Sequence, residues 1–342
     1  HPAGQVMKAD ILGIYIKQHL DAWEGDNVMF SWHGGELLLA GLDFYRKVIG
    51  LQKEYNREGK RIINAIQTNG MLLDNEWCSF LSENGFIVGL SIDGTAELHN
   101  MHRKSAAGIA SHNPVLKAWD LLKLYNISHE LLFVVSNTNV AFPLDVYNFF
   151  RERAAEYITF LPLVEREGDN EVSPGSVDPL KFGQFLVSIF DAWKAEDIGR
   201  IKIQVFEEAL RTAFGQEHTL CIFRKECGGV PLLEKNGNFY TCDHYADNEN
   251  LVGNIRESSL TTLLLSRKQT DFGRHKETSL PLYCRQCEVI DMCNGECPRN
   301  RFVNTPDGEP LHNYLCPGYM MLFNHIRPFA DMVATAWKST PV

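Results

Sequence analysis

Hydrophobic positions up to about residue 210 alternate between two patterns. Short, nearly continuous apolar runs predict strands, and apolar residues three or four positions apart between these runs predict amphipathic helices. The expected strands are 28–32, 61–67, 86–92, 130–135, 157–164 and 201–206. The expected helices are 6–23, 38–55, 74–84, 115–125, 144–154 and one that opens at Asp178-Pro179. Strands that alternate with helices in this way are typical of a parallel α/β sheet.

The pattern changes near residue 215, where short segments punctuated by glycine and cysteine replace the alternation of strands and helices. We therefore predict two domains, 1–210 and 215–342, and a C-terminal helix over 320–337 that packs on the first domain. A length of 342 residues fits two domains of ordinary size.

Charge and hydropathy exclude two classes of partner. The chain has 33 Lys and Arg against 43 Asp and Glu, a formal net charge of −10, and no basic cluster, so we expect it to bind neither nucleic acid nor an anionic membrane. No run reaches the roughly 18 apolar residues of a membrane helix, and the first residues do not have the pattern of a secretory signal. We expect a cytoplasmic protein.

Four of the expected strands end in polar or glycine-containing groups. They are His-Gly-Gly-Glu at 33–36, Gln-Thr-Asn-Gly at 67–70, Ser-Ile-Asp-Gly at 91–94 and Ser-Asn-Thr at 136–138. Glycine and asparagine often end strands simply to turn the chain, but parallel α/β proteins bind ligands at the carboxyl ends of their strands. Four such groups at corresponding positions favour a shared ligand pocket. Neither the dinucleotide fingerprint G-x-G-x-x-G nor the esterase elbow G-x-S-x-G is present.

Eight of the nine cysteines lie between residues 221 and 316, and only Cys78, expected to be a buried structural thiol, lies outside. The eight are Cys221, Cys227, Cys242, Cys284, Cys287, Cys293, Cys297 and Cys316. Disulfides need an oxidising compartment, so metal ligation by two four-cysteine sites is favoured. Zinc and iron–sulfur clusters both accept four thiolates. A zinc ribbon has two C-x2-C pairs, whereas only 284–287 has that spacing here, which favours iron–sulfur clusters.

One carboxylate accompanies these cysteines. Asp243 directly follows Cys242, and a carboxylate beside a cluster ligand at the edge of a pocket is well placed to transfer a proton.

These motifs carry a resemblance to a known family. The cysteine pattern, with Gly237 five residues before Cys242, resembles the SPASM domain of radical S-adenosylmethionine peptide-modifying enzymes. The strand-end motifs and the Cys242-Asp243 pair resemble those of anaerobic sulfatase-maturating enzymes, over nearly the whole chain. The matching segments are 34–36, 67–70, 90–94, 98–100 and 103–104. The resemblance implies an α/β fold: a partial (β/α) TIM-type barrel of the radical S-adenosylmethionine class, followed by a SPASM domain.

The resemblance also implies an activity. Enzymes of this family oxidise a Cys or Ser in a sulfatase active-site motif to Cα-formylglycine, by means of a 5′-deoxyadenosyl radical derived from S-adenosylmethionine. Asp243 matches the family's general base. The positions that match those holding S-adenosylmethionine are Gly35, Ser91, Arg103 and Val164. Beside them, Gly34 leaves the backbone open to the methionine amino group, and Glu36 can complement its charge.

Partners follow from the same resemblance. The implied substrate is an unfolded sulfatase polypeptide, and the implied electron donor is a flavodoxin or ferredoxin.

The family's ligand sets assign the eight cysteines to two auxiliary four-iron clusters. Cys221, Cys227, Cys242 and Cys297 match the ligands of the nearer cluster, and Cys284, Cys287, Cys293 and Cys316 those of the farther one. A third cluster, which cleaves S-adenosylmethionine, is held in the family by a C-x3-C-x2-C loop that these 342 residues lack. We expect that loop upstream of His1, and the chain as given to be inactive alone. Leu37 is a second departure, because the family has proline there.

Two other functions stay open at this point. A different radical peptide maturase, such as one that forms thioether crosslinks, would use the same clusters, although the Cys242-Asp243 pair favours sulfatase maturation. A zinc-bearing, non-catalytic peptide-binding module is the alternative from another class.

Overall fold

The computed structural model describes residues 6–168 and 171–339, so the outer ends of both predicted domains lie outside the described residues. The chain forms two compact units that are interleaved along the sequence. The first unit comprises 1–92, 103–130 and 228–272, and the second comprises 93–102, 131–227 and 273–342. The predicted division near residues 210–215 stays a prediction.

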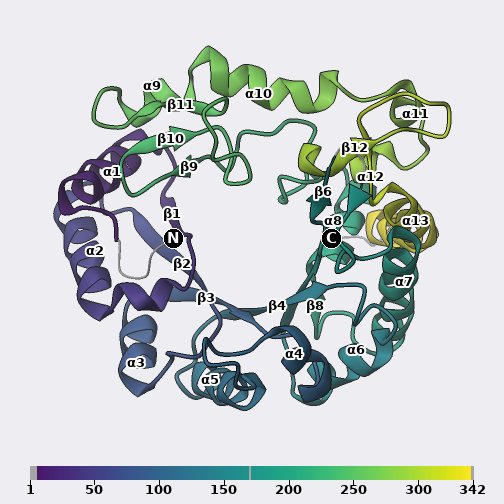
Figure 1. The fold of residues 1–342 in the computed structure, drawn as a ribbon, viewed down its shortest axis with the longest axis horizontal. Coiled ribbons are helices and arrows are strands. Elements are labelled where there is room, and N and C mark those ends of the chain that lie inside the picture. The colour runs from purple at the N-terminus through teal and green to yellow at the C-terminus, as the bar shows by residue number, and fades with distance from the viewer. Residues whose placement is uncertain (1–5, 169–170, 340–342) are drawn as a thin grey trace. The chain divides into compact units, whose positions relative to one another are not determined.

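Three parallel strands form the centre of the first unit: β1 (Asn27–Trp32), β2 (Arg61–Thr68) and β3 (Phe86–Ser91). Trp32 pairs with Ile66, and Thr68 with Leu90, so the carboxyl ends of the strands lie at one edge. Figure 1 shows three helices on the outer side of these strands: α1 (Ala9–Ala22), α2 (Leu42–Tyr55) and α3 (Asn75–Glu83). The first unit contains a further helix, α5 (His112–Leu124), which follows β3 in the sequence.

Helix boundaries in the first unit follow local chemistry. The Asp74 carboxylate accepts a hydrogen bond from Trp77 N at 2.9 Å and begins α3, as expected of an N-cap. Cys78 lies on the buried face of α3 and is fully buried, as predicted.

The predicted helix 38–55 is wrong in one respect. Gly41, with a left-handed φ of 79°, separates a short 3-10 helix, η1 (Leu37–Ala40), from α2.

Part of the cysteine-rich region also belongs to the first unit. The strands β9 (Leu232–Leu233), β10 (Asn238–Tyr240) and β11 (Leu251–Asn254) form a small antiparallel sheet, followed by α9 (Leu260–Leu264). The apolar side of this sheet and α9 pack on α1, in a buried cluster of Ile11, Phe239, Ile255, Leu260 and Leu263. An ion pair between Arg256 and Asp10 accompanies this apolar contact.

The second unit contains most of β4 (His129–Val135), together with β5 (Tyr157–Pro162) and β8 (Lys202–Ile203), and these three strands are parallel. Its helices in this region are α4 (Ala96–His102), α6 (Pro143–Glu152), α7 (Pro179–Glu196) and α8 (Gln204–Ala213). Two short strands, β6 (Arg166–Glu167) and β7 (Glu171–Val172), pair antiparallel. The predicted strand 201–206 is wrong beyond Ile203, because Gln204 begins α8, which buries Val205, Phe206 and Ala209 on one face.

No helix in the described part of the chain is long and apolar enough to cross a bilayer.

The remaining elements are short until the C-terminal helix. They are α10 (Arg267–Thr278), α11 (Leu282–Arg285), α12 (Ile290–Cys293), η2 (Pro298–Asn300), β12 (Arg301–Val303), β13 (His312–Asn313) and α13 (Cys316–Ser339). Helix α13 packs on α7 and α8, which confirms the predicted docking of the C-terminal helix. At the crossing with α7 the two backbones touch, since a Cβ built on Gly183 would lie 2.7 Å from Gly318 Cα.

This crossing predicts a stability effect for Gly318→Ala. The added Cβ would lie 3.0 Å from Gly183 N and still closer to Pro179 O, so the helices must separate. We expect a destabilisation of about 1–3 kcal/mol, measured as a fall in the midpoint of thermal or urea unfolding. Gly50→Ala is the matched control, because Gly50 is an exposed residue of α2 with nothing within 4 Å of its Cβ position. An unchanged midpoint in Gly318→Ala would contradict the close crossing.

Candidate metal centre

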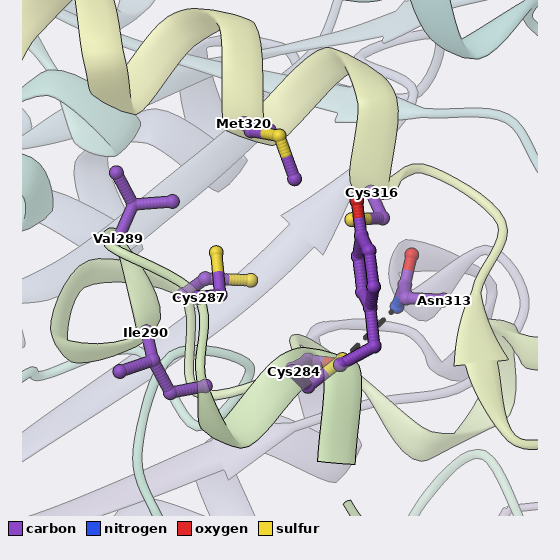
Figure 2. A pocket seen from close by; sticks show the side chains of 10 residues that line it. Cys284, Cys287, Val289, Ile290, Asn313, Cys316 and Met320 are labelled. Atoms are coloured by element: carbon purple, nitrogen blue, oxygen red, sulfur yellow. Dashed lines mark hydrogen bonds between the residues drawn. The ribbon is translucent and has the colours of Figure 1, made fainter. Parts of the chain in front are cut away.

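Four cysteines line one pocket in the second unit, and Figure 2 shows Cys284, Cys287 and Cys316 around the same space. Cys284 lies on α11 and Cys293 is the last residue of α12. Cys287 lies in the turn between them, where its N–H donates to Cys284 O at 3.1 Å, and Cys316 is the first residue of α13. The short helices therefore bring together cysteines that are spread from position 284 to position 316 of the sequence.

The rest of this pocket is mainly apolar. Val289, Ile290 and Met320 line it, with Met320 facing the cysteines in Figure 2. Burial, reinforced by the charges of Cys284 and Cys287, raises the pKa of Cys316 to about 12. Burial likewise raises the pKa of Cys293, with a further contribution from Cys316. These thiols therefore stay protonated unless a metal cation displaces the protons.

The donor set of this pocket fits the expected group. Four convergent thiols in an apolar surrounding are the ligands that iron–sulfur clusters and zinc accept. The nine cysteines are all free thiols. Among the described residues, no group of three or more His, Cys, Asp or Glu side chains is placed to hold a single metal ion.

The other four cysteines are placed by their backbones. In the second unit, Cys227 N donates to Gly273 O at 3.0 Å, and Cys221 O accepts from Lys276 Nζ at 3.0 Å. Cys297, in the same unit, precedes the 3-10 helix η2. Cys242 follows β10 and belongs to the first unit. The grouping of these four cysteines around one cluster stays a prediction.

Asp243 lies beside the sulfur of its neighbour, with Cys242 Sγ donating to Asp243 Oδ1 at 3.2 Å. The segment before this pair is fixed from α10. Gln269 Nε2 donates to Thr241 O at 3.1 Å and to Gly228 O at 3.0 Å, and the Gln269 side chain is buried. The carboxylate thus sits on a short strand end whose backbone is held in place.

Glu36 joins the ends of two strands in the first unit. Its Oε1 accepts from Leu38 N at 3.1 Å and from Thr68 Oγ1 at 2.7 Å, and its Oε2 accepts from Asn69 N at 2.9 Å. The predicted motifs after β1 and β2 therefore meet at one edge of the parallel strands. A carboxylate has about four acceptor positions, so one of them, on Oε2, remains for a further donor.

The other residues predicted for S-adenosylmethionine lie at strand ends or in nearby loops. Gly34 and Gly35 follow β1, and a Cβ on Gly35 would meet nothing within 4 Å. Ser91 is the buried last residue of β3. Arg103 belongs to the first unit, where its carbonyl accepts from Ser111 Oγ at 2.8 Å. Val164, buried just after β5, belongs to the second unit.

Sequence reasoning missed three buried polar residues that contact the cysteine-bearing segments: Gln269, Lys276 and Arg301. Gln269 and Lys276, together with Gly273, recur at intervals of four and three on α10, so they share one helix face. That spacing is the signal that could have indicated a buried polar face.

Comparisons with known proteins identify the cysteine-rich region first. Residues 232–288 match the SPASM family model, described as an iron–sulfur cluster-binding domain.

Relatives match along the whole chain. A serine-type anaerobic sulfatase-maturating enzyme of Bacteroides thetaiotaomicron is 41% identical, over 96% of this chain and 83% of that protein. A cysteine-type enzyme of Clostridium perfringens is 30% identical, over 97% of this chain and 90% of that protein. The solved structure of native anSMEcpe with bound AdoMet and the Kp18Cys peptide has a TM-score of 0.88 and 31% identity, over 96% of this chain and 91% of that chain. This agreement confirms the predicted fold class, a radical S-adenosylmethionine α/β fold with a SPASM region. The chain belongs to the family of anaerobic sulfatase-maturating enzymes.

Proposed function

We propose that this chain belongs to an enzyme that oxidises a Cys or Ser residue of a sulfatase polypeptide to Cα-formylglycine, and that the cluster which cleaves S-adenosylmethionine is held by the C-x3-C-x2-C loop that these 342 residues lack. The observation that carries the proposal is the 41% identity to a serine-type maturase over 83% of that enzyme's length. Cysteine-type enzymes match at 30–31% identity, so both kinds of target residue are represented among the relatives. The similar solved structure with bound AdoMet and a peptide supports the same pair of ligands here.

S-adenosylmethionine and iron–sulfur clusters would complete the site. S-adenosylmethionine supplies, when bound, the 5′-deoxyadenosyl radical that takes a hydrogen atom from the target Cβ. We assign Gly34, Gly35, Glu36, Ser91, Arg103 and Val164 to its binding. The remaining acceptor position on Glu36 Oε2 suits the methionine ammonium, because a charge-assisted hydrogen bond there adds to the three that already fix the carboxylate.

The eight cysteines are assigned to two auxiliary four-iron clusters. Cys284, Cys287, Cys293 and Cys316, which line one pocket, hold one of them. Cys221, Cys227, Cys242 and Cys297 hold the other. The match of residues 232–288 to an iron–sulfur cluster-binding domain favours clusters over the zinc-bearing module.

Asp243 is the proposed proton acceptor for the target thiol or hydroxyl. Its Oδ1 accepts a hydrogen bond from the Cys242 thiol at 3.2 Å. A cysteine that ligates a metal must lose its proton, so ligation by Cys242 removes this donor from the carboxylate. Asp243 Oδ1 then becomes available to the target side chain.

The electron donor and the compartment complete the proposal. A low-potential flavodoxin or ferredoxin is proposed to reduce the clusters. The cytoplasm is the proposed location, because its reducing conditions keep nine free cysteines in the thiol state.

Asp243→Asn tests the base. In the complete gene product, assayed anaerobically with a peptide bearing a sulfatase active-site motif, formylglycine formation should fall about 10²–10⁴-fold, because the amide cannot accept the proton. Formation of 5′-deoxyadenosine should stay measurable. Glu249→Gln, which alters an exposed carboxylate of the same loop, is the control and should keep both products. Undiminished formylglycine from Asp243→Asn would remove this residue from the base role.

Cys316→Ala tests the metal centre by iron analysis of the reconstituted protein. Loss of one ligand should remove about four irons per chain, the content of one cluster. Cys78→Ala, which alters a buried cysteine of α3 outside both ligand sets, should leave the iron content unchanged. A wild-type protein with two zinc ions and no iron would contradict the assignment.

A further inference from the structure

The turn between Cys293 and Cys297 has an unusual backbone. Asn294, Gly295 and Glu296 are consecutive residues with left-handed φ angles of 46°, 70° and 51°. Asparagine adopts this conformation readily, whereas glutamate favours it only when the surroundings impose it. A Cβ on Gly295 would collide with Leu280 and with the Arg301 guanidinium, so this position requires glycine. Something must therefore hold the turn.

Arg301 holds it. This side chain is 5% exposed, and its guanidinium donates to the carbonyl of every residue in the turn. Nε donates to Gly295 O at 2.8 Å, and Nη2 donates to Asn294 O at 2.9 Å and Glu296 O at 3.2 Å. Because Cys293 and Cys297 flank the turn, Arg301 fixes one cysteine assigned to each cluster.

The same guanidinium reaches the Cys221 segment through Lys276. Arg301 Nη1 donates to Lys276 O at 2.6 Å. Lys276 is fully buried, and its Nζ donates to Cys221 O at 3.0 Å and Ile222 O at 2.7 Å. A continuous chain of hydrogen bonds thus runs from the Cys221 backbone to the turn that separates Cys293 from Cys297.

Arg301 and Lys276 do not direct their hydrogen bonds to carboxylates. Among the residues that the structure describes, the donors of both cations go to backbone carbonyls. The neighbouring buried carboxylate, Glu296, accepts instead from Asn300 and Asn313, and burial raises its pKa. A buried cation is costly unless negative charge lies nearby, and Glu296 is a neighbouring carboxylate whose charge acts on both cations.

Thiolates are a further source of negative charge once the cysteines bind metal. Cys293 and Cys297 flank the turn that Arg301 holds, and Lys276 Nζ donates to Cys221 O at 3.0 Å. Cysteines of both ligand sets therefore lie on the segments that the two cations bind.

We infer that Arg301 and Lys276 are positioning residues for both cysteine sets and fixed counter-charges for the groups that these cysteines bind. The inference rests on the cluster assignment of the proposed function. Reduction by one electron, from a donor of the flavodoxin or ferredoxin class, adds one negative charge to a cysteine-bound cluster. A fixed cation in a medium of low dielectric favours that reduced state and so raises the reduction potential.

The test is a redox titration of the auxiliary clusters in the complete gene product, reconstituted with iron and sulfide. Electron paramagnetic resonance monitors the reduced clusters during the titration. Arg301→Met and Lys276→Met should each lower the ratio of reduced to oxidised cluster at a given potential at least tenfold, about 59 mV for a one-electron couple. Arg301→Lys keeps the charge but loses the planar fork of donors. It should therefore retain a potential near that of the wild type while binding less iron. Arg267→Met removes an exposed cation of α10 and is the control, expected to change neither quantity.

Potentials that stay at the wild-type value in both Arg301→Met and Lys276→Met would overturn the counter-charge role. An iron content that stays normal in both Arg301→Met and Arg301→Lys would overturn the positioning role. If Arg301→Met binds too little iron for a titration, that loss supports positioning, and Lys276→Met decides the counter-charge. A wild-type protein without iron would instead overturn the cluster assignment, so failure of the proposed function is distinguishable from failure of this inference.

Discussion

The cysteine-rich part of this protein depends on charge being compensated where water is excluded. Burial raises the pKa of Cys293 and Cys316, so their sulfurs resist ionisation, and burial lowers the pKa of Lys276 and Arg301, so their positive charge is costly there. Each penalty falls when the opposite charge is present. Metal binding by the thiolates therefore stabilises the buried cations as well as the cysteine loops, and it couples the order of this region to its metal content.

The cysteine loops have little regular structure of their own, so side chains must hold their backbones. Helix α10 supplies several of these contacts from one face. Gln269 donates to carbonyls beside Cys242 and Cys227, Gly273 O accepts from Cys227 N, and Lys276 donates to Cys221 O. A side chain at 273 would press on Cys227 O, since a Cβ there would lie 2.8 Å away. The glycine is thus required by the close approach and not by its φ angle.

Much of the fold could be predicted because it is encoded locally. The buried apolar runs located β1 to β5 to within about two residues, and Asp74 and Asp178 accept hydrogen bonds at the helix starts predicted for them. The strand predicted at 201–206 was a misreading of a local signal, because Val205, Phe206 and Ala209 recur at helical spacing and form the buried face of α8. Elements that depend on distant contacts were harder to predict. The packing of Phe239 and Leu260 on α1 leaves no periodic signal in either segment.

The candidate site likewise has one part that the sequence indicates and one part that only the tertiary structure reveals. Cysteine spacing indicated metal ligands, but Arg301 and Lys276 look like ordinary surface residues in the sequence, and only tertiary contacts reveal their burial. Their acceptors explain why they matter. If a carboxylate had taken the donors of Arg301, the pair would be nearly neutral and its field at the sulfurs small. Backbone carbonyls satisfy the same donors as dipoles, and the full positive charge remains to act on the cysteines.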